Sequence, residues 1–217
     1  MSHSLHGTPL FNNHFSRITW SETIRALTVV GQNLEPAIFA HFQPHAHATA
    51  RLTRRFAAYL FGGNKRRHWL DEIECGAYMH DVGKYFIAPE ILLKPDQLDD
   101  EERKVMSLHS VYGALAISKL PGVTNIIHGV ALRHHEHWDG LGYPEGLSGT
   151  SIPIEARLVA VADVYISLRA KRSYKPSLGK EEAFGTLKRM AGRELDPSLV
   201  EDFLRAFNHS ARLRKET

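Results

Sequence analysis

The dipeptide His80-Asp81 ends an apolar helical stripe, and this position constrains the fold more than any other feature of the sequence. Leu70, Ile73 and Ala77 precede His80 at steps of three and four residues, which is the period of one face of an α-helix. His80 therefore emerges at the inner end of this helix, and Asp81 follows where the chain leaves it. An imidazole and a neighbouring carboxylate can each give one donor atom to a metal ion, or can bridge two ions.

Other histidines and aspartates take comparable places along the chain. His45 shares a stripe with Thr49, in a helix that we expect to begin at Pro44 and to end at Gly62-Gly63. Asp163 follows the apolar run 158–162, and a buried carboxylate must be paired, hydrogen-bonded or bound to a metal. In chain order, the candidate metal ligands are His45, His80, Asp81, His109, His134, His135 and Asp163.

Helical periodicity prevails along the chain. The sequence 19–22 has capping-box spacing ahead of an apolar run to Val30, and Asp99-Asp100 caps a helix that carries His109. No segment of any length alternates in the manner of a strand. We expect an all-α fold in three parts: an N-terminal extension at 1–43 that is irregular and then helical, one domain of about seven or eight helices at 44–210, and a basic tail at 211–217.

Composition excludes several classes of protein. The net charge is +3 and the basic residues are spread out without interleaved aromatic residues, so we expect no nucleic-acid polymer as a partner. No apolar run reaches the roughly 18 residues that a membrane span requires. The single cysteine, Cys75, rules out an internal disulfide framework and indicates the reducing cytoplasm. The 14 histidines, in contrast, suit metal ligation or titration near neutral pH.

The candidate ligands indicate what kind of metal site they would form. Mixed imidazole and carboxylate donors suit iron, manganese, zinc or nickel, and do not suit calcium or an iron–sulfur cluster. The set is too large for one ion, whereas two ions about 3.5–4 Å apart would use it, with Asp81 as the natural bridge. Such a site can supply a bridging hydroxide as nucleophile and can neutralise charge on a phosphoryl group.

Several motifs in order make the sequence recognisable. His-Asp-Val-Gly-Lys at 80–84 is followed by Ile-Ala-Pro-Glu-Ile-Leu at 87–92 and by Lys94-Pro95. His-His-Glu at 134–136 leads to Asp139, Gly140, Leu141, Gly142, Tyr143 and Pro144. Ile-Pro-Ile at 152–154 and Arg157 lead to Ala-Asp-Val at 162–164. Over roughly residues 45–207 the chain resembles the HD-GYP family, a branch of the HD phosphohydrolase superfamily.

The resemblance implies an all-helical fold with a di- or tri-nuclear iron or manganese centre, and hydrolysis of cyclic di-GMP to pGpG and often on to GMP. By position, it makes the candidate ligands above the metal ligands, and it gives Asp81 and Lys84 catalytic roles. It also implies a set of substrate-binding residues: Lys84, Arg157, Asp139, Gly142, Tyr143 and Pro144.

The chain departs from the family pattern at two positions. Family members with three metals have a glutamate one turn before the first ligand histidine, and here that position is His41. We therefore expect two divalent ions, iron first and manganese as the alternative, with His41 as the candidate for an extra ligand. Two residues after Val164, the family's usual aspartate is replaced by Ile166.

Two alternatives to cyclic di-GMP hydrolysis stay open. One is a phosphodiesterase that prefers cyclic GMP-AMP. The other is a sensor with little activity, which would bind a cyclic dinucleotide or dock a signalling protein. An HD-type nucleotidase of mononucleotides would leave the sequence 139–144 unexplained. The sequence leaves the native metal, the oligomeric state and the regulatory input undetermined.

Overall fold

The computed structural model describes residues 36–62, 66–170 and 177–208, and the side chains from residue 43 onward within them. The elements in chain order are α2 (Pro36–Phe61), α3 (Arg67–Met79), η1 (Val82–Phe86), α4 (Pro89–Leu92), α5 (Asp100–Ser107), α6 (His109–Ile117), α7 (Asn125–Arg133), η2 (Gly149–Ser151), α8 (Ile154–Arg169), α9 (Lys180–Met190) and α10 (Pro197–Asn208). Over these ranges there is no β-strand, only an isolated bridge between Ala191 and Leu195. The predicted all-α fold is confirmed.

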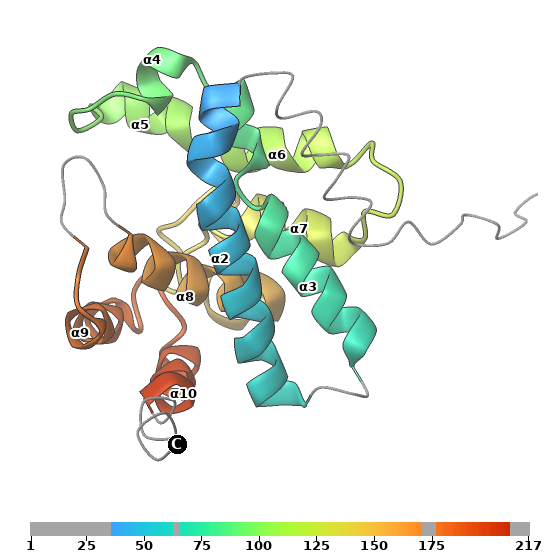
Figure 1. Cartoon of the computed structure of the whole chain (residues 1–217), viewed down its shortest axis with the longest axis vertical. Helices are drawn as coiled ribbons and strands as arrows, with labels where there is room; N and C mark the ends of the chain where they lie inside the picture. Colours follow the sequence, from blue (N-terminus) through green and yellow to red (C-terminus); the bar gives the residue numbers. More distant parts are fainter. Residues whose placement is uncertain (1–35, 63–65, 171–176, 209–217) are drawn as a thin grey trace, which may run out of the picture.

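The long helix α2 lies at the centre of the molecule (Figure 1). It packs against α3 on one side and α8 on another, and α3 in turn packs against α7. Helices α4, α5 and α6 gather near the beginning of α2, whereas α9 and α10 pack on α8. In the described part of the chain, no helix is both long and apolar enough to cross a membrane.

The core fills the space between these helices with large apolar side chains. Phe56 of α2, Ile73 of α3, Leu158 of α8 and Phe203 of α10 are all fully buried. The Phe56 and Phe203 rings meet edge to face with centroids 5.1 Å apart, a favoured aromatic geometry. Burial of such side chains is the main stabilising contribution to the fold, at roughly 1.5–3 kcal/mol each.

Side-chain caps define where three of the helices begin. Asp99 is the N-cap of α5, as predicted, and it forms a capping box: its carboxylate accepts from Glu102 N–H, and the Glu102 carboxylate accepts from Asp99 N–H, each at 2.9 Å. Thr124 caps α7, and Asp196 caps α10 just before Pro197. These caps satisfy backbone donors that the first helical turn leaves unpaired.

The beginning of α2 differs from the prediction. We expected Pro44 to lie in the first turn of a helix, but α2 begins at Pro36 and contains Pro44. A proline inside a helix loses one backbone hydrogen bond, and here the packing of α2 against α3 and α8 compensates for it. The helix therefore runs across residues 43 and 44, where we placed the start of the domain. The helix predicted from the capping box at 19–22 lies outside the described residues.

The helix predicted to begin at Asp99-Asp100 and to carry His109 is two helices. Helices α5 and α6 meet at Leu108, whose N–H donates to Val105 O, three residues back, at 3.1 Å. This tighter turn resembles a 3₁₀-helix and interrupts the regular α-helical pattern. His109 thereby becomes the first residue of α6.

Candidate metal centre

The structure brings the seven predicted ligands together from five helices. His80 and His134 are the C-terminal cap residues of α3 and α7. A side chain at a helix end can project from the helix toward a space that several elements share. The ligands come from these elements: His45 from α2, His80 and Asp81 from the end of α3, His109 from α6, His134 and His135 from the end of α7, and Asp163 from α8.

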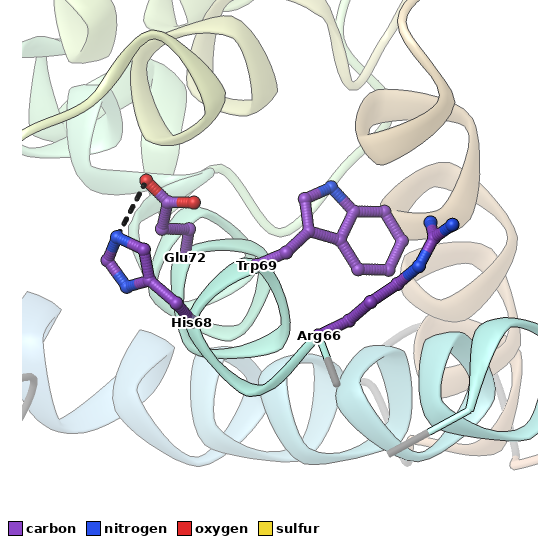
Figure 2. A pocket seen from close by; sticks show the side chains of 4 residues that line it. All are labelled: Arg66, His68, Trp69 and Glu72. Carbon is purple, nitrogen blue, oxygen red and sulfur yellow. Dashed lines mark ion pairs between the residues drawn. The ribbon is translucent and has the colours of Figure 1, made fainter. Parts of the chain in front are cut away.

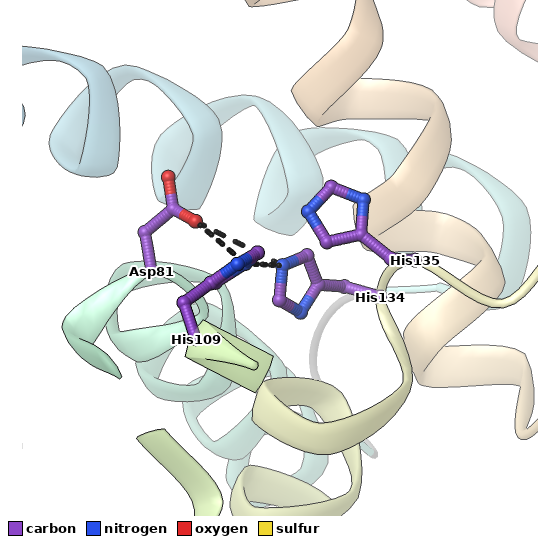
Figure 3. Close-up of side chains that lie close together, drawn as sticks. All are labelled: Asp81, His109, His134 and His135. Atoms are coloured by element: carbon purple, nitrogen blue, oxygen red, sulfur yellow. Dashed lines mark hydrogen bonds and ion pairs between the residues drawn. The ribbon is translucent and has the colours of Figure 1, made fainter. Parts of the chain in front are cut away.

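The first group consists of Asp81, His109, His134 and His135, whose candidate donor atoms lie within 4.8 Å of one another. Figure 3 shows one carboxylate oxygen of Asp81 directed toward the histidines. Asp81 Oδ1 lies 3.3 Å from His109 Nε2 and 3.9 Å from His134 Nε2. The Nε2 atoms of His109 and His134 are 3.3 Å apart. Nitrogen atoms this close, facing a carboxylate oxygen, are arranged as ligands of one cation.

The second group consists of His45, His80 and Asp81, with donor atoms again within 4.8 Å. Asp163 adjoins it, because its Oδ1 lies 2.7 Å from His45 Nε2 and 3.6 Å from His80 Nε2. The other oxygen of Asp81, Oδ2, lies 3.3 Å from His80 Nε2. Asp81 therefore belongs to both groups and presents one oxygen to each, as a carboxylate that bridges two ions would.

Hydrogen bonds to the backbone orient three of the imidazoles. His80 Nδ1 lies 2.7 Å from Ala77 O, and His109 Nδ1 lies 2.7 Å from Met106 O. His134 Nδ1 makes the same contact with the carbonyl three residues before it, at 3.1 Å. An N–H at Nδ1 donates to each carbonyl, and this hydrogen bond directs Nε2 into the cluster.

Three polar atoms in the cluster are buried without a hydrogen-bond partner among the described residues: His80 Nε2, Asp81 Oδ1 and Asp163 Oδ1. His80 is fully buried and Asp81 is only 7% exposed. Buried polar atoms without partners are costly, and a bound ion would satisfy all three. The donor set, with imidazole nitrogens and carboxylate oxygens around a shared space, therefore fits divalent transition metals.

Electrostatics keep the carboxylates ionised. Burial alone would raise the pKa of Asp81, but His80 and Lys84 outweigh it and hold the pKa well below its usual range. Burial would also raise the pKa of Asp163, but the neighbouring imidazoles of His45 and His80 hold it well below its usual range. Both side chains are thus in the charged form that binds a cation.

The imidazoles divide into two kinds. Burial, together with neighbouring imidazoles, lowers the pKa of His134 far below its usual value and that of His135 to about 3. Neutral imidazole is the form that binds metals. His80 differs: burial would lower its pKa, but Asp81 and Asp163 raise it to about 10. A divalent ion at Nε2 would take the place of that proton and its positive charge.

Gly83 allows the close approach that places Asp81 beside His109. A Cβ atom at Gly83 would overlap the backbone oxygen of His109 and the backbone nitrogen of Gly113. Gly83 is not among the glycines with positive φ, so no left-handed backbone requires a glycine there. Its role is to let η1 lie directly against α6.

Lys84 places a cation at the edge of the cluster. Its Nζ lies 2.6 Å from Asp81 Oδ2, the oxygen that also faces His80. The Lys84 side chain is about one-fifth exposed (21%), whereas Asp81 is buried. A ligand that reaches the centre from solvent would therefore meet this ammonium group.

The Gly-Tyr-Pro loop lies against the cluster. The Tyr143 ring stacks on His135 with centroids 4.9 Å apart and an interplanar angle of 29°. Gly142 is packed so closely that a Cβ atom there would overlap the backbone at His137 and His135. Pro144 follows a cis peptide bond and is exposed. The loop thus borders the candidate centre.

Sequence reasoning missed the residue that anchors this loop. Glu136 is 3% exposed, and its carboxylate accepts hydrogen bonds from Glu145 N at 2.7 Å and from Leu147 N at 2.8 Å. The sequence signal that could have revealed Glu136 is its position directly after two histidines that were expected to point inward. Asp139, a predicted substrate contact, is exposed, and its side chain accepts from Leu141 N within a turn.

Arg157 makes an ion pair with Asp196, the residue that caps α10. Its guanidinium donates to Asp196 Oδ2 at 2.6 Å and to Ile152 O at 2.9 Å, and it lies over the Trp138 ring. The Arg157 side chain is 15% exposed and the Asp196 side chain 4%. The predicted contact with a substrate phosphate stays a prediction, whereas the structure gives Arg157 a place between α8, α10 and the loop.

His47 and one surface pocket lie outside the two ligand groups. The side chain of His41 lies outside the described residues. His47 packs on the Tyr78 ring, with centroids 4.7 Å apart, and belongs to neither ligand group. A pocket of about 410 Å³ lies near the beginning of α3. Figure 2 shows the side chains that line it, Trp69 among them. His80 lies beyond the other end of that helix, so the pocket is separate from the candidate centre.

Comparison with known proteins agrees with this arrangement. The family model described as HD domain matches residues 33–199, which is most of the chain. The chain belongs to the HD domain family. Two curated relatives from Vibrio cholerae indicate to which branch of this family the chain belongs. A protein named probable cyclic di-GMP phosphodiesterase is 35% identical over 82% of this chain and 42% of its own length. One named 3′3′-cGAMP-specific phosphodiesterase 2 is 39% identical over 94% of this chain and 39% of its own.

The predicted assignment to the HD-GYP branch is confirmed. The chain spans less than half the length of these two curated relatives. Among solved structures, an HDGYP protein from Bdellovibrio bacteriovorus matches 87% of this chain and 61% of its own, with a TM-score of 0.63 at 16% identity. That likeness concerns the fold, which it supports independently of the sequence motifs.

Proposed function

We propose that this protein is a metal-dependent phosphodiesterase that opens cyclic di-GMP to linear pGpG, with further cleavage to GMP as a second step. The observation that carries the proposal is the pair of ligand groups that share Asp81. A binuclear centre of this kind suits hydrolysis of a phosphodiester. The names of the curated relatives support a cyclic dinucleotide as the substrate.

Two divalent ions would occupy the centre, iron first and manganese as the alternative. One would be held by Asp81 with the three histidines of the first group, the other by His45, His80, Asp81 and Asp163. When bound, such ions activate water and neutralise phosphoryl charge. We propose no third ion, because an imidazole at His41 brings no negative charge to offset another divalent cation.

In the proposed reaction, water adds its oxygen to one phosphorus, and the bond from that phosphorus to the ribose 3′ oxygen breaks. The 3′ oxygen takes up a proton, and the phosphate stays on the 5′ oxygen of the other nucleoside. Lys84 would bind a non-bridging phosphate oxygen beside Asp81, a charge-assisted contact worth about 1.5–3 kcal/mol. Gly142, Tyr143 and Pro144 would form one wall of the substrate site, and Asp139 the turn that supports it.

A second candidate substrate is cyclic GMP-AMP. The 3′3′-cGAMP-specific relative aligns with 94% of this chain, so the chain's likeness to it includes the whole candidate site. Both substrates contain the same phosphodiester ring and would be opened by the same chemistry. The candidate centre therefore supports hydrolysis of either substrate. Cyclic di-GMP and cyclic GMP-AMP differ only in their nucleobases.

One experiment tests the proposal. Protein purified without added metal would be analysed for metal content and then incubated with cyclic di-GMP and with 3′3′-cGAMP, and the products separated by chromatography. We expect about two ions per chain, iron before manganese, and linear dinucleotide from cyclic di-GMP faster than from the hybrid. Metal-loaded protein that binds the nucleotides but releases no product would contradict the proposal and favour the sensor alternative.

A further inference from the structure

Four large apolar side chains form an exposed stripe along α5 and α6. Val105, Leu108, Tyr112 and Leu115 are 37%, 38%, 36% and 62% exposed. Their spacing of three, four and three residues is that of a coiled-coil seam, which places them along one side of a helix. Scattered exposed leucines are ordinary, but a continuous seam of them marks a contact surface.

The helical run that carries the stripe is nearly continuous. Leu108, between α5 and α6, keeps helical backbone angles of φ −66° and ψ −14°, and Tyr112 N–H donates to its carbonyl at 2.9 Å. Figure 1 shows the two helices following one another at one end of the molecule. From Asp100 to Ile117 the run extends about 27 Å at the usual rise per residue.

The stripe faces away from the body of the protein. The opposite side of α6 is buried and includes His109, Gly113 and Ile117, so the helix is already held on that side. Phe86 of η1 and Leu93 of α4 are also exposed, at 54% and 51%, on elements that contact α6 and α5.

We propose that this stripe is the interface of a twofold-symmetric dimer, in which α5 and α6 pair antiparallel with the same helices of a second copy. The stripe is complementary to itself in that register. Val105 meets the partner subunit's Leu115, and Leu108 meets the partner subunit's Tyr112, so every apolar residue faces another. Such reciprocal pairing is the rule for a twofold interface.

Charge supports the second copy as the occupant. In the same register, Glu101, four residues before Val105, faces the partner subunit's Lys119, four residues after Leu115. The twofold symmetry forms this pair at both ends of the stripe. Glu101 and Lys119 are both exposed. In the single chain Glu101 pairs with Lys104 at 2.6 Å, an exposed contact that can exchange at little cost. Opposite charges at both ends of an apolar seam set its register.

The interface would also act on the candidate centre. His109 is the first residue of α6 and lies on the buried side of the helix that carries the stripe. In the dimer, the second copy would pack on the exposed side of α5 and α6, while η1 packs on the buried side of α6. The dimer is therefore expected to steady one ligand in each subunit, although each subunit carries its complete set of ligands.

Sedimentation velocity of the full chain over about a hundredfold range of concentration tests the dimer. We expect the wild-type protein to dimerise, and Tyr112→Ser or Leu115→Glu to raise the dissociation constant at least about tenfold. The matched control is Tyr59→Ser, because Tyr59 is 57% exposed on α2, away from the stripe. Circular dichroism would show that each variant folds. A monomeric wild type, or a dimer that Leu115→Glu leaves intact, would overturn the proposal.

Charge reversal tests the register. Glu101→Lys should weaken the dimer, and adding Lys119→Glu to it should restore most of the loss, because the two reversed charges again face each other. Glu201→Lys is the control, since Glu201 is also exposed and also pairs with a basic residue of its own helix, Arg205, at 2.5 Å. Failure of the double variant to recover would show that Glu101 and Lys119 do not face each other and would overturn the antiparallel register.

Discussion

At the scale of single residues, the two ring nitrogens of His80 have different tasks. Nδ1 is hydrogen-bonded to Ala77 O, and Nε2 is buried in the cluster, facing Asp81 and Asp163, with no hydrogen-bond partner among the described residues. We predict that His80→Ala loses metal and activity while the helical circular dichroism largely survives. His47→Ala is the control, because His47 belongs to neither ligand group. Full metal content in His80→Ala would contradict the ligand assignment.

Arg157 leads to a prediction about stability. Removing one partner of a buried ion pair typically costs about 3–5 kcal/mol, and the partial exposure of Arg157 places the expected loss for Arg157→Ala near the lower end. Denaturant unfolding of metal-loaded protein would measure it. Asp196→Asn is the companion variant, because asparagine can still cap α10. If Arg157 instead binds substrate phosphate, Arg157→Ala would raise KM with unfolding unchanged.

At the scale of elements, the contact between η1 and α6 sets the distance from Asp81 to His109. We predict that Gly83→Ala forces η1 away from α6, because its Cβ would overlap the His109 backbone, and that metal content and unfolding free energy both fall. Gly129→Ala is the control: a Cβ there meets only Arg133 Nη1 at 3.6 Å. Within α7 that change should stabilise by about 0.5–1 kcal/mol.

The Gly-Tyr-Pro loop gives a second prediction at this scale. Both oxygens of Glu136 accept backbone N–H groups of the loop. Glu136→Gln replaces one acceptor with an NH₂ group that faces a donor, so one bond is lost. We expect faster hydrogen exchange at residues 137–147 and a higher KM, with metal content unchanged. Unchanged exchange in these residues would show that the loop does not depend on this anchor.

At the scale of the whole molecule, metal binding should couple to folding. The ligands come from five helices, so a bound ion ties together segments from His45 to Asp163. Any ligand that binds only the folded state stabilises it, by about 2.7 kcal/mol at a concentration of one hundred times Kd. We predict that a chelator lowers Tm and that divalent iron or manganese restores it. The gain should shrink as pH falls, because protons compete for the imidazoles. If the purified protein contains metal and a chelator leaves its Tm unchanged, this coupling is contradicted.

The sequence by itself determined the elements and the order of the candidate ligands. Helical period and caps are local properties, so α3 lies on the predicted apolar stripe that ends at His80, and α5 begins directly after the predicted cap Asp99. Position on an inward stripe is also local, and this is why His134 and Asp163 could be identified before the structure was known.

Only the tertiary structure decided how these parts meet. Pro44 lies inside a helix because α3 and α8 pack on α2. Gly83 is required because any Cβ atom at this position would overlap the backbone oxygen of His109. Arg157 pairs with Asp196, a residue 39 positions away in the chain. Contacts between residues so far apart leave no periodic signal in the sequence, because they depend on how whole helices pack.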